Sequence, residues 1–116
     1  MSNSLGNFPM VIDTDITTWR SAAAVVSLGY ATGIRVLKLV LSVGPSGASS
    51  AGTVTITAPS DSATLYEPMV VPTGQAAYTV LYEDNLTDTK GTLTWRDFAV
   101  TGVTATGTRL FLYWTV

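Results

Sequence analysis

The longest apolar run in the chain, Ile34–Val43, constrains the fold more than any other stretch. Ten residues that include two charges fall well short of the roughly 20 apolar residues that a membrane-spanning helix needs. Several of the ten are β-branched, which suits a pleated strand. By the two-residue period of a strand, Leu37, Leu39 and Leu41 share one face, and the other face is also apolar. We therefore predict a central strand that is buried on both faces, or by a core on one face and a neighbouring subunit on the other.

Shorter strand-like segments, separated by turn residues, occupy much of the remaining chain. Thr53–Ala58 alternates threonines with apolar residues, which is typical of a strand with one buried face. Leu65–Val71 contains Pro68, which favours an edge position because proline cannot donate to a ladder. Further segments of this kind are Ala76–Glu83, Leu93–Val103 and Leu110–Val116. The pattern predicts one all-β domain over residues 14–116, an antiparallel β-sandwich or jelly roll of about seven or eight strands.

The first 28 residues leave two questions open. Residues 1–13 are predicted to form an N-terminal arm that reaches a neighbouring subunit, or a short edge strand. In residues 14–28, apolar residues at helical spacing lie between Asp15, a candidate cap, and Gly29, a candidate stop. The β-branched residues of the same segment favour a strand instead. We predict the strand, because a lone helix would need its own partner face.

The alternation of apolar residues changes phase between Trp95 and Phe98. Trp95 falls at an odd position with Leu93, whereas Phe98 falls at an even position with Val100. A β-bulge at residues 96–97 would add one residue and return both rings to the same side of the sheet.

The final segment carries large apolar side chains on both faces. Leu110, Leu112 and Trp114 share the face that we expect to be buried, and Phe111 and Tyr113 occupy the other. We expect ten residues to form the core and the assembly surface. They are Leu37, Leu39, Leu41, Trp95, Phe98, Leu110, Phe111, Leu112, Tyr113 and Trp114.

Charged residues are scarce in this chain. They make up 12% of it, against about 25% in a typical domain, while hydrophobic residues make up 47%. A domain of this size cannot bury so much apolar surface internally, so the composition predicts a surface that another subunit covers. A neutral surface rich in threonine and serine is the alternative. We expect a homo-oligomer.

The chain contains no histidine and no cysteine. This excludes Ser-His-Asp and Cys-His catalysis, the usual zinc sites and disulfides. A glycosidase would need two of the eight carboxylates to face each other across a cleft, and no pair stands out. We therefore predict a protein that is not an enzyme and has no cofactor or metal. A net charge of −2 without a basic cluster predicts no nucleic-acid partner, and we expect no membrane partner.

Two ligand sites are weaker alternatives. Asp84, Asn85 and Asp88 offer oxygen ligands for calcium within one loop, although their spacing differs from an EF-hand. Tyrosines on strands can stack on sugars, but such residues more often belong to a core or an interface. The tyrosines in question are Tyr66, Tyr78, Tyr82 and Tyr113. The glycine-rich loop Gly44–Gly52 lacks the Lys-Ser or Lys-Thr end and the following helix of a phosphate-binding loop.

The stretch Trp95–Tyr113 reads WRDFAVTGVTATGTRLFLY. An aromatic-apolar strand ends in Gly-Val, a short Thr/Ala/Gly turn follows, and a Leu-Tyr strand closes the stretch. This arrangement resembles the closing hairpin of small virion proteins of tailed bacteriophages. The strand Ile34–Ser42, the Ser/Ala/Gly loop and the strand Thr53–Thr57 are similar to the earlier part of that layout, so the resemblance covers roughly 80 residues. It defines no functional residues and does not extend to the first 30 residues.

The resemblance implies a structural role in a virion. We expect a capsid decoration or cement protein on the head exterior, bound to the major capsid protein as a homo-oligomer. A trimer would match the threefold positions of a capsid. The alternative is a binding module associated with a fibre, neck or tail, with a glycan as its ligand. The N-terminus lacks the basic and apolar regions of a signal peptide, so we expect synthesis in the host cytoplasm and residence in the virion.

Overall fold

The computed structural model describes residues 9–20, 34–47, 49–86, 93–95 and 97–115. Within these ranges the chain forms nine strands and the short helix α3. In chain order the elements are β1 (Met10–Ile12), β2 (Ile16–Arg20), β3 (Ile34–Val43), β4 (Gly52–Thr57), β5 (Thr64–Val71), β6 (Val80–Asn85), β7 (Leu93–Trp95), β8 (Asp97–Thr101), α3 (Val103–Thr106) and β9 (Thr108–Thr115).

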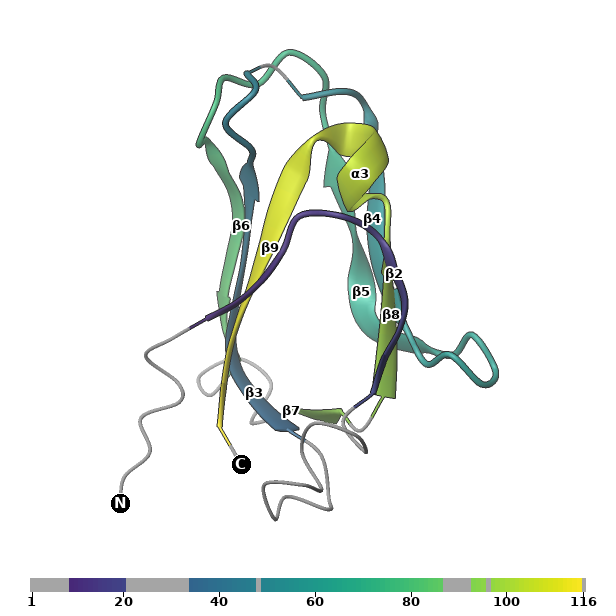
Figure 1. Ribbon diagram of the computed structural model, residues 1–116. Coiled ribbons are helices and arrows are strands. Elements are labelled where there is room, and N and C mark those ends of the chain that lie inside the picture. The colour runs from purple at the N-terminus through teal and green to yellow at the C-terminus, as the bar shows by residue number, and fades with distance from the viewer. Residues whose placement is uncertain (1–8, 21–33, 48, 87–92, 96, 116) are drawn as a thin grey trace.

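The strands form two antiparallel sheets that face each other (Figure 1). Sheet I has the order β1-β9-β3-β6, and β7 also pairs with β3. Sheet II has the order β2-β8-β4-β5. With the short β7 set aside, this is the strand order of an eight-stranded jelly roll. The predicted all-β sandwich is therefore confirmed, and the strand order selects the jelly roll.

Strand β3 has the predicted bounds and lies inside sheet I. It pairs with β9 along one side and with β6 and β7 along the other, so its backbone groups have partners in both directions. Four of its side chains are completely buried and face sheet II. They are Val36, Leu39, Leu41 and Val43.

The faces of β3 differ from the prediction at Leu37. Along the pairing with β9, Val36 lies opposite Trp114, but Lys38 lies opposite Tyr113. One residue of β3 is thus extra, and Leu37 forms a β-bulge. The bulge reverses the alternation, so Val36 joins the core and Leu37 is only half-buried.

The core lies between the two sheets and draws on nearly every strand. Phe98 of β8 is its largest completely buried side chain, and Leu39, Leu41, Leu110 and Leu112 face it from sheet I. Burial of these side chains removes them from water, which is the main stabilising contribution to a sandwich of this size.

The predicted bulge between Trp95 and Phe98 is wrong. The two residues belong to different sheets, because β7 pairs with β3 in sheet I and β8 pairs with β2 and β4 in sheet II. The change of phase in the sequence therefore marks a crossing between sheets, which is common at the corners of sandwiches. Both side chains are buried, and their ring centroids lie 5.4 Å apart in the core.

The strand predicted in residues 14–28 is present as β2, at the edge of sheet II. Residues 21–28 lie outside the described ranges. Strand β1 falls within residues 1–13, where an arm or an edge strand was predicted, and it pairs with β9 at the edge of sheet I. Pro68 lies in β5, which is the other edge strand of sheet II, as its missing N–H predicts.

Candidate functional site

The structure divides the ten residues expected in the core and the assembly surface into two groups. Six are buried: Leu39, Leu41, Trp95, Phe98, Leu110 and Leu112. Four are half-buried: Leu37, Phe111, Tyr113 and Trp114. Trp114 packs against the core. Phe111 and Tyr113 lie on the outer face of sheet I, because they alternate with the buried Leu110 and Leu112.

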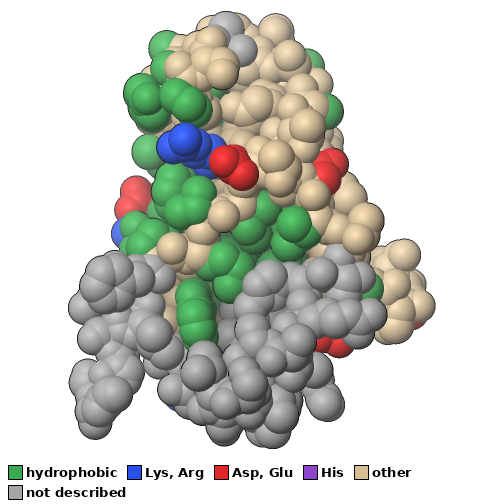
Figure 2. Space-filling view, viewed as in Figure 1, with side chains coloured by type: hydrophobic (Ala, Val, Ile, Leu, Met, Phe, Trp, Pro, Cys, Tyr) green, Lys and Arg blue, Asp and Glu red, His purple; other side chains and the backbone are tan. Residues whose placement is uncertain are grey.

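A row of hydrophobic side chains crosses the outer face of sheet I. Phe111 of β9 lies in register between Val11 of β1 and Val40 of β3. Val11 is 49% exposed, and the other two are half-buried by their neighbours. We call Val11, Phe111 and Val40 the outer hydrophobic strip. The space-filling view shows few charged groups among the hydrophobic and neutral side chains on the face that it presents (Figure 2).

One ion pair borders the outer hydrophobic strip. The Lys38 Nζ lies 2.9 Å from Glu83 Oε2, and Glu83 is in register with Val40. The same ammonium lies 5.6 Å from the centroid of the Tyr113 ring. The hydrogen bond to Glu83 raises the pKa of Lys38 above its ordinary value. The outer hydrophobic strip is thus bordered by an ion pair, in which Lys38 keeps its positive charge at neutral pH.

Two of the tyrosines hold one edge of the sandwich together. The buried Tyr66 of β5 donates a hydrogen bond to Asp84 of β6, which links sheet II to sheet I. The hydroxyl of Tyr82 donates to the carbonyl of Val70 at 3.0 Å and accepts from its N–H at 3.1 Å. These contacts close the sandwich between β5 and β6. They also occupy backbone groups of an edge strand that a foreign strand would otherwise pair with.

The four tyrosines do not form the sugar-stacking platform that was the alternative to a core or interface role. Tyr66 is buried, and Tyr82 is directed to the backbone of β5. Tyr113 lies beneath Lys38 on the outer face of sheet I. Tyr78 is 65% exposed in the connection before β6. Tyr66 and Tyr82 are engaged at the β5–β6 edge, and Tyr113 and Tyr78 lie elsewhere, so the four rings do not form one stacking surface.

The alternative calcium site is not assembled by the residues that the structure describes. Asp84 accepts the hydrogen bond of Tyr66, and Asp88 lies outside the described ranges. Within those ranges no three acidic, histidine or cysteine side chains come together as metal ligands would.

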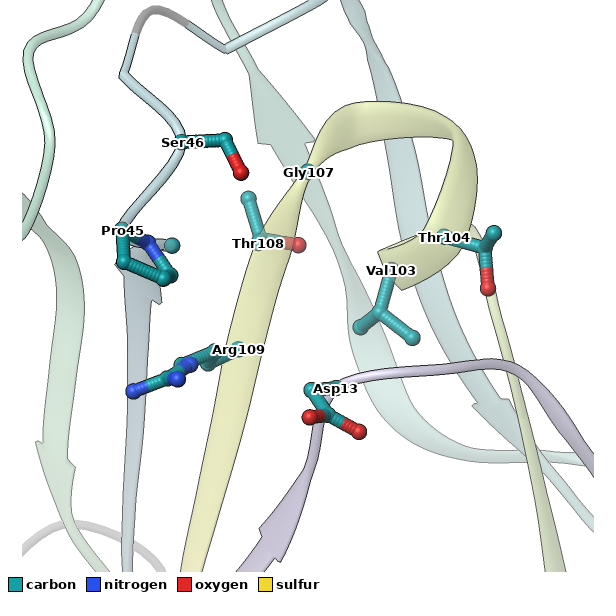
Figure 3. Close-up of a pocket in the computed structure, with 9 residues that line it drawn as sticks. Asp13, Pro45, Ser46, Val103, Thr104, Gly107, Thr108 and Arg109 are labelled. Carbon is teal, nitrogen blue, oxygen red and sulfur yellow. The ribbon is translucent and has the colours of Figure 1, made fainter.

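A half-open cavity of about 260 Å³ lies at one end of the sandwich (Figure 3). Asp13 comes from the β1–β2 connection, and Arg109 comes from the start of β9. The remaining lining residues belong to the β3–β4 loop, α3 and the start of β9. They are Gly44, Pro45, Ser46, Val103, Thr104, Gly107 and Thr108. Asp13 is the single carboxylate among them, so this cavity does not hold the carboxylate pair of a glycosidase.

Close backbone contacts fix the shape of this cavity. The N–H of Gly44 donates to the carbonyl of Gly107 at 2.8 Å, and a Cβ on Gly44 would lie only 2.9 Å from that oxygen. The loop after β3 therefore needs glycine where it meets the start of β9. On the other side, Asp15 and Thr104 exchange two hydrogen bonds that join the β1–β2 connection to α3. Hydrogen bonds within the fold therefore join the segments that line the cavity.

Sequence reasoning did not find this cavity. Its lining comes from residues 13, 44–46, 103–104 and 107–109, which adjoin only after the jelly roll has formed. The glycine-rich loop and the Thr/Ala/Gly turn are both evident in the sequence, but each indicates only a loop or a turn when it is considered alone. No pattern in the sequence indicates that these two turns meet.

Comparison of the chain with protein-family models, with curated proteins and with solved structures gives no match. Among the described residues, no helix is long and apolar enough to cross a membrane.

Proposed function

We propose that the protein is a non-enzymatic structural protein of a tailed-bacteriophage virion, and that it decorates or cements the exterior of the capsid. The observation that carries this proposal is the outer hydrophobic strip of Val11, Phe111 and Val40 on sheet I. A hydrophobic strip on the outer side of a sheet is poorly hydrated, so a protein partner that covers it gains stability.

The distribution of charge supports the proposal. Protein interfaces commonly have a hydrophobic centre with a polar border, and the border orients the partner more than it adds affinity. The outer hydrophobic strip has this arrangement, with the Lys38–Glu83 ion pair at its margin. The low charge of the whole chain, 12% of residues, favours a molecule whose surface is partly covered in its working state.

The proposed partners are the major capsid protein and further copies of this chain, with a trimer as the preferred oligomer. A repeated particle presents the same surface many times, and several weak contacts made by one oligomer multiply. Jelly rolls occur in capsid proteins and in lectins, so the fold accommodates this role without deciding it.

Capsid binding tests the proposal. The purified protein is mixed with capsids that lack it, taken from the phage that encodes it, and the particles are sedimented and imaged by electron microscopy. We expect saturable co-sedimentation and added density on the capsid exterior. Val40→Lys should abolish binding, because it places a charged and strongly hydrated side chain in the centre of the hydrophobic contact. Val70→Lys is the matched control, since Val70 is 62% exposed on the outer side of sheet II.

Absence of binding by the wild-type protein would contradict the proposal. Density confined to the neck, tail or fibres would contradict the assignment to the capsid. Equal losses in the two lysine variants would show that the outer hydrophobic strip is not the contact.

A further inference from the structure

The cavity at the end of the sandwich contains a positive charge that forms no ion pair with any residue that the structure describes. Arg109 is half-buried, and within the described part of the chain no ion pair or hydrogen bond involves its side chain. Its side chain extends from β9 toward β3, below Pro45 in the view, whereas Asp13 lies on the other side of β9 (Figure 3). An arginine presents five N–H donors, so this side chain has its full donor capacity available for a ligand.

Some of the other polar side chains of the cavity hydrogen-bond within the fold, and others are exposed and can bind a ligand. Thr104 is engaged with Asp15, and the buried Thr108 shares a hydrogen bond with Thr106. By contrast, Asp13 and Ser46 are exposed and make no side-chain hydrogen bond within the described ranges. A ligand would thus meet the guanidinium of Arg109 from the start of β9, the hydroxyl of Ser46 from the β3–β4 loop and the carboxylate of Asp13 from the β1–β2 connection.

We propose that this cavity binds an acidic monosaccharide, with the sugar carboxylate on Arg109 and sugar hydroxyls on Asp13 and Ser46. An arginine binds a carboxylate through two parallel hydrogen bonds, which adds direction as well as charge. Asp13 disfavours a ligand that is only an anion, but it accepts hydrogen bonds from hydroxyl groups. A compound with one carboxylate and several hydroxyls offers a partner of matching chemistry to each of these side chains.

The dimensions of the cavity suit a single sugar ring. Its volume of about 260 Å³ lies just below the range of roughly 300–1,000 Å³ that is usual for drug-sized ligands. Its walls are joined by the Gly44–Gly107 and Asp15–Thr104 hydrogen bonds, so little ordering of the backbone accompanies binding. This site uses none of the residues of the outer hydrophobic strip, and the proposal is independent of the virion role.

Titration calorimetry with D-glucuronate tests the site. A ligand with so few atoms and one strong contact should bind with a dissociation constant on the order of 1 mM. We expect glucose, which lacks the carboxylate, and propionate, which lacks the hydroxyls, to bind at least tenfold more weakly. Arg109→Gln should weaken glucuronate binding at least tenfold. Arg35→Gln is the control, because it removes an exposed arginine from the opposite end of β3.

Circular dichroism should show that the glutamine variants remain folded. If Arg109→Gln unfolds, Arg109→Lys keeps the charge but loses the two-point contact, and it should also weaken binding. Failure of the wild-type protein to bind glucuronate would overturn the site. An equal loss in the Arg35 variant would do the same. Propionate binding as tight as glucuronate binding would overturn the assignment to a sugar.

Discussion

Asp15 and Thr104 hold each other through two reciprocal hydrogen bonds, although 89 residues separate them in the chain. The N–H of Asp15 donates to Thr104 Oγ1 at 2.8 Å, and the N–H of Thr104 donates to Asp15 Oδ1 at 3.0 Å. Thr104 lies in the first turn of α3, whose own N-cap residue, Gly102, has no side chain to offer. Asp15 therefore serves as a cap from another part of the chain.

Removal of this distant cap should weaken the fold measurably. Asp15→Ala leaves the Thr104 N–H without its acceptor, and we expect a loss of about 1 kcal/mol in the free energy of unfolding. Urea denaturation measures it. Asp13→Ala is the control, because Asp13 is exposed and has no such bond among the described residues. Equal effects from the two changes would show that general charge, and not the cap, is responsible.

Two glycines at the ends of α3 should respond differently to the same substitution. Gly102 and Gly107 both have positive φ angles, 99° and 69°. A Cβ on Gly102 would lie 2.0 Å from the carbonyl oxygen of Thr53, whereas a Cβ on Gly107 would meet nothing within 4 Å. Gly107→Ala should cost about 1–2 kcal/mol of stability from backbone strain alone, and Gly102→Ala about 2–5 kcal/mol. If denaturation shows equal losses of stability for the two variants, β4 can move away from the added Cβ at position 102 without cost.

The buried Tyr66 should make the protein sensitive to alkali. Burial first, and the hydrogen bond to Asp84 second, raise the pKa of Tyr66 well above its ordinary value of about 10. The folded state therefore holds this proton more tightly than the unfolded state does. Its contribution to stability is fully present below about pH 10 and is lost as the pH rises through the raised pKa.

Tyrosinate absorbance, recorded against pH, checks this expectation. One of the five tyrosines should ionise only as the protein unfolds, and Tyr66→Phe should remove that late step. The loss of stability with rising pH should also become shallower in this variant. Tyr78→Phe, at an exposed position, should leave the late step in place. A late step that persists in Tyr66→Phe would assign it to another tyrosine.

The sequence predicted the sandwich because its strongest signals are local. The β-branched, ten-residue run of β3 and the alternation of β4 require only the period of a strand. The faces of β3 were less predictable, because the bulge at Leu37 depends on how β3 pairs with β9. The change of phase between Trp95 and Phe98 is evident in the sequence, but a crossing between sheets and a β-bulge within one strand produce the same sequence pattern.

The cavity and the edge contacts were beyond sequence reasoning for a different reason. The cavity, the Asp15–Thr104 pair and the Tyr66–Asp84 bond join residues that are distant in the chain. In the sequence Asp15 is a candidate cap only for the residues that follow it, and nothing local connects it to Thr104. Only the order of the strands brings these side chains together.

The outer hydrophobic strip should also govern self-association. We expect the purified protein to form a symmetric oligomer, preferably a trimer, through Phe111 and its neighbours Val11 and Val40. Phe111→Glu places a carboxylate on a half-buried position of this strip, and an unpaired charge in a contact is costly to bury. The variant should sediment as a monomer at a concentration where the wild-type protein sediments as an oligomer.

Sedimentation velocity across a range of concentrations measures this difference, and Val70→Glu provides the control on sheet II. Because Phe111 does not lie in the core, both variants should remain folded, with similar circular dichroism spectra. A wild-type protein that stays monomeric at high concentration would contradict self-association. If the Val70 variant dissociates and the Phe111 variant does not, the contact lies on the outer face of sheet II.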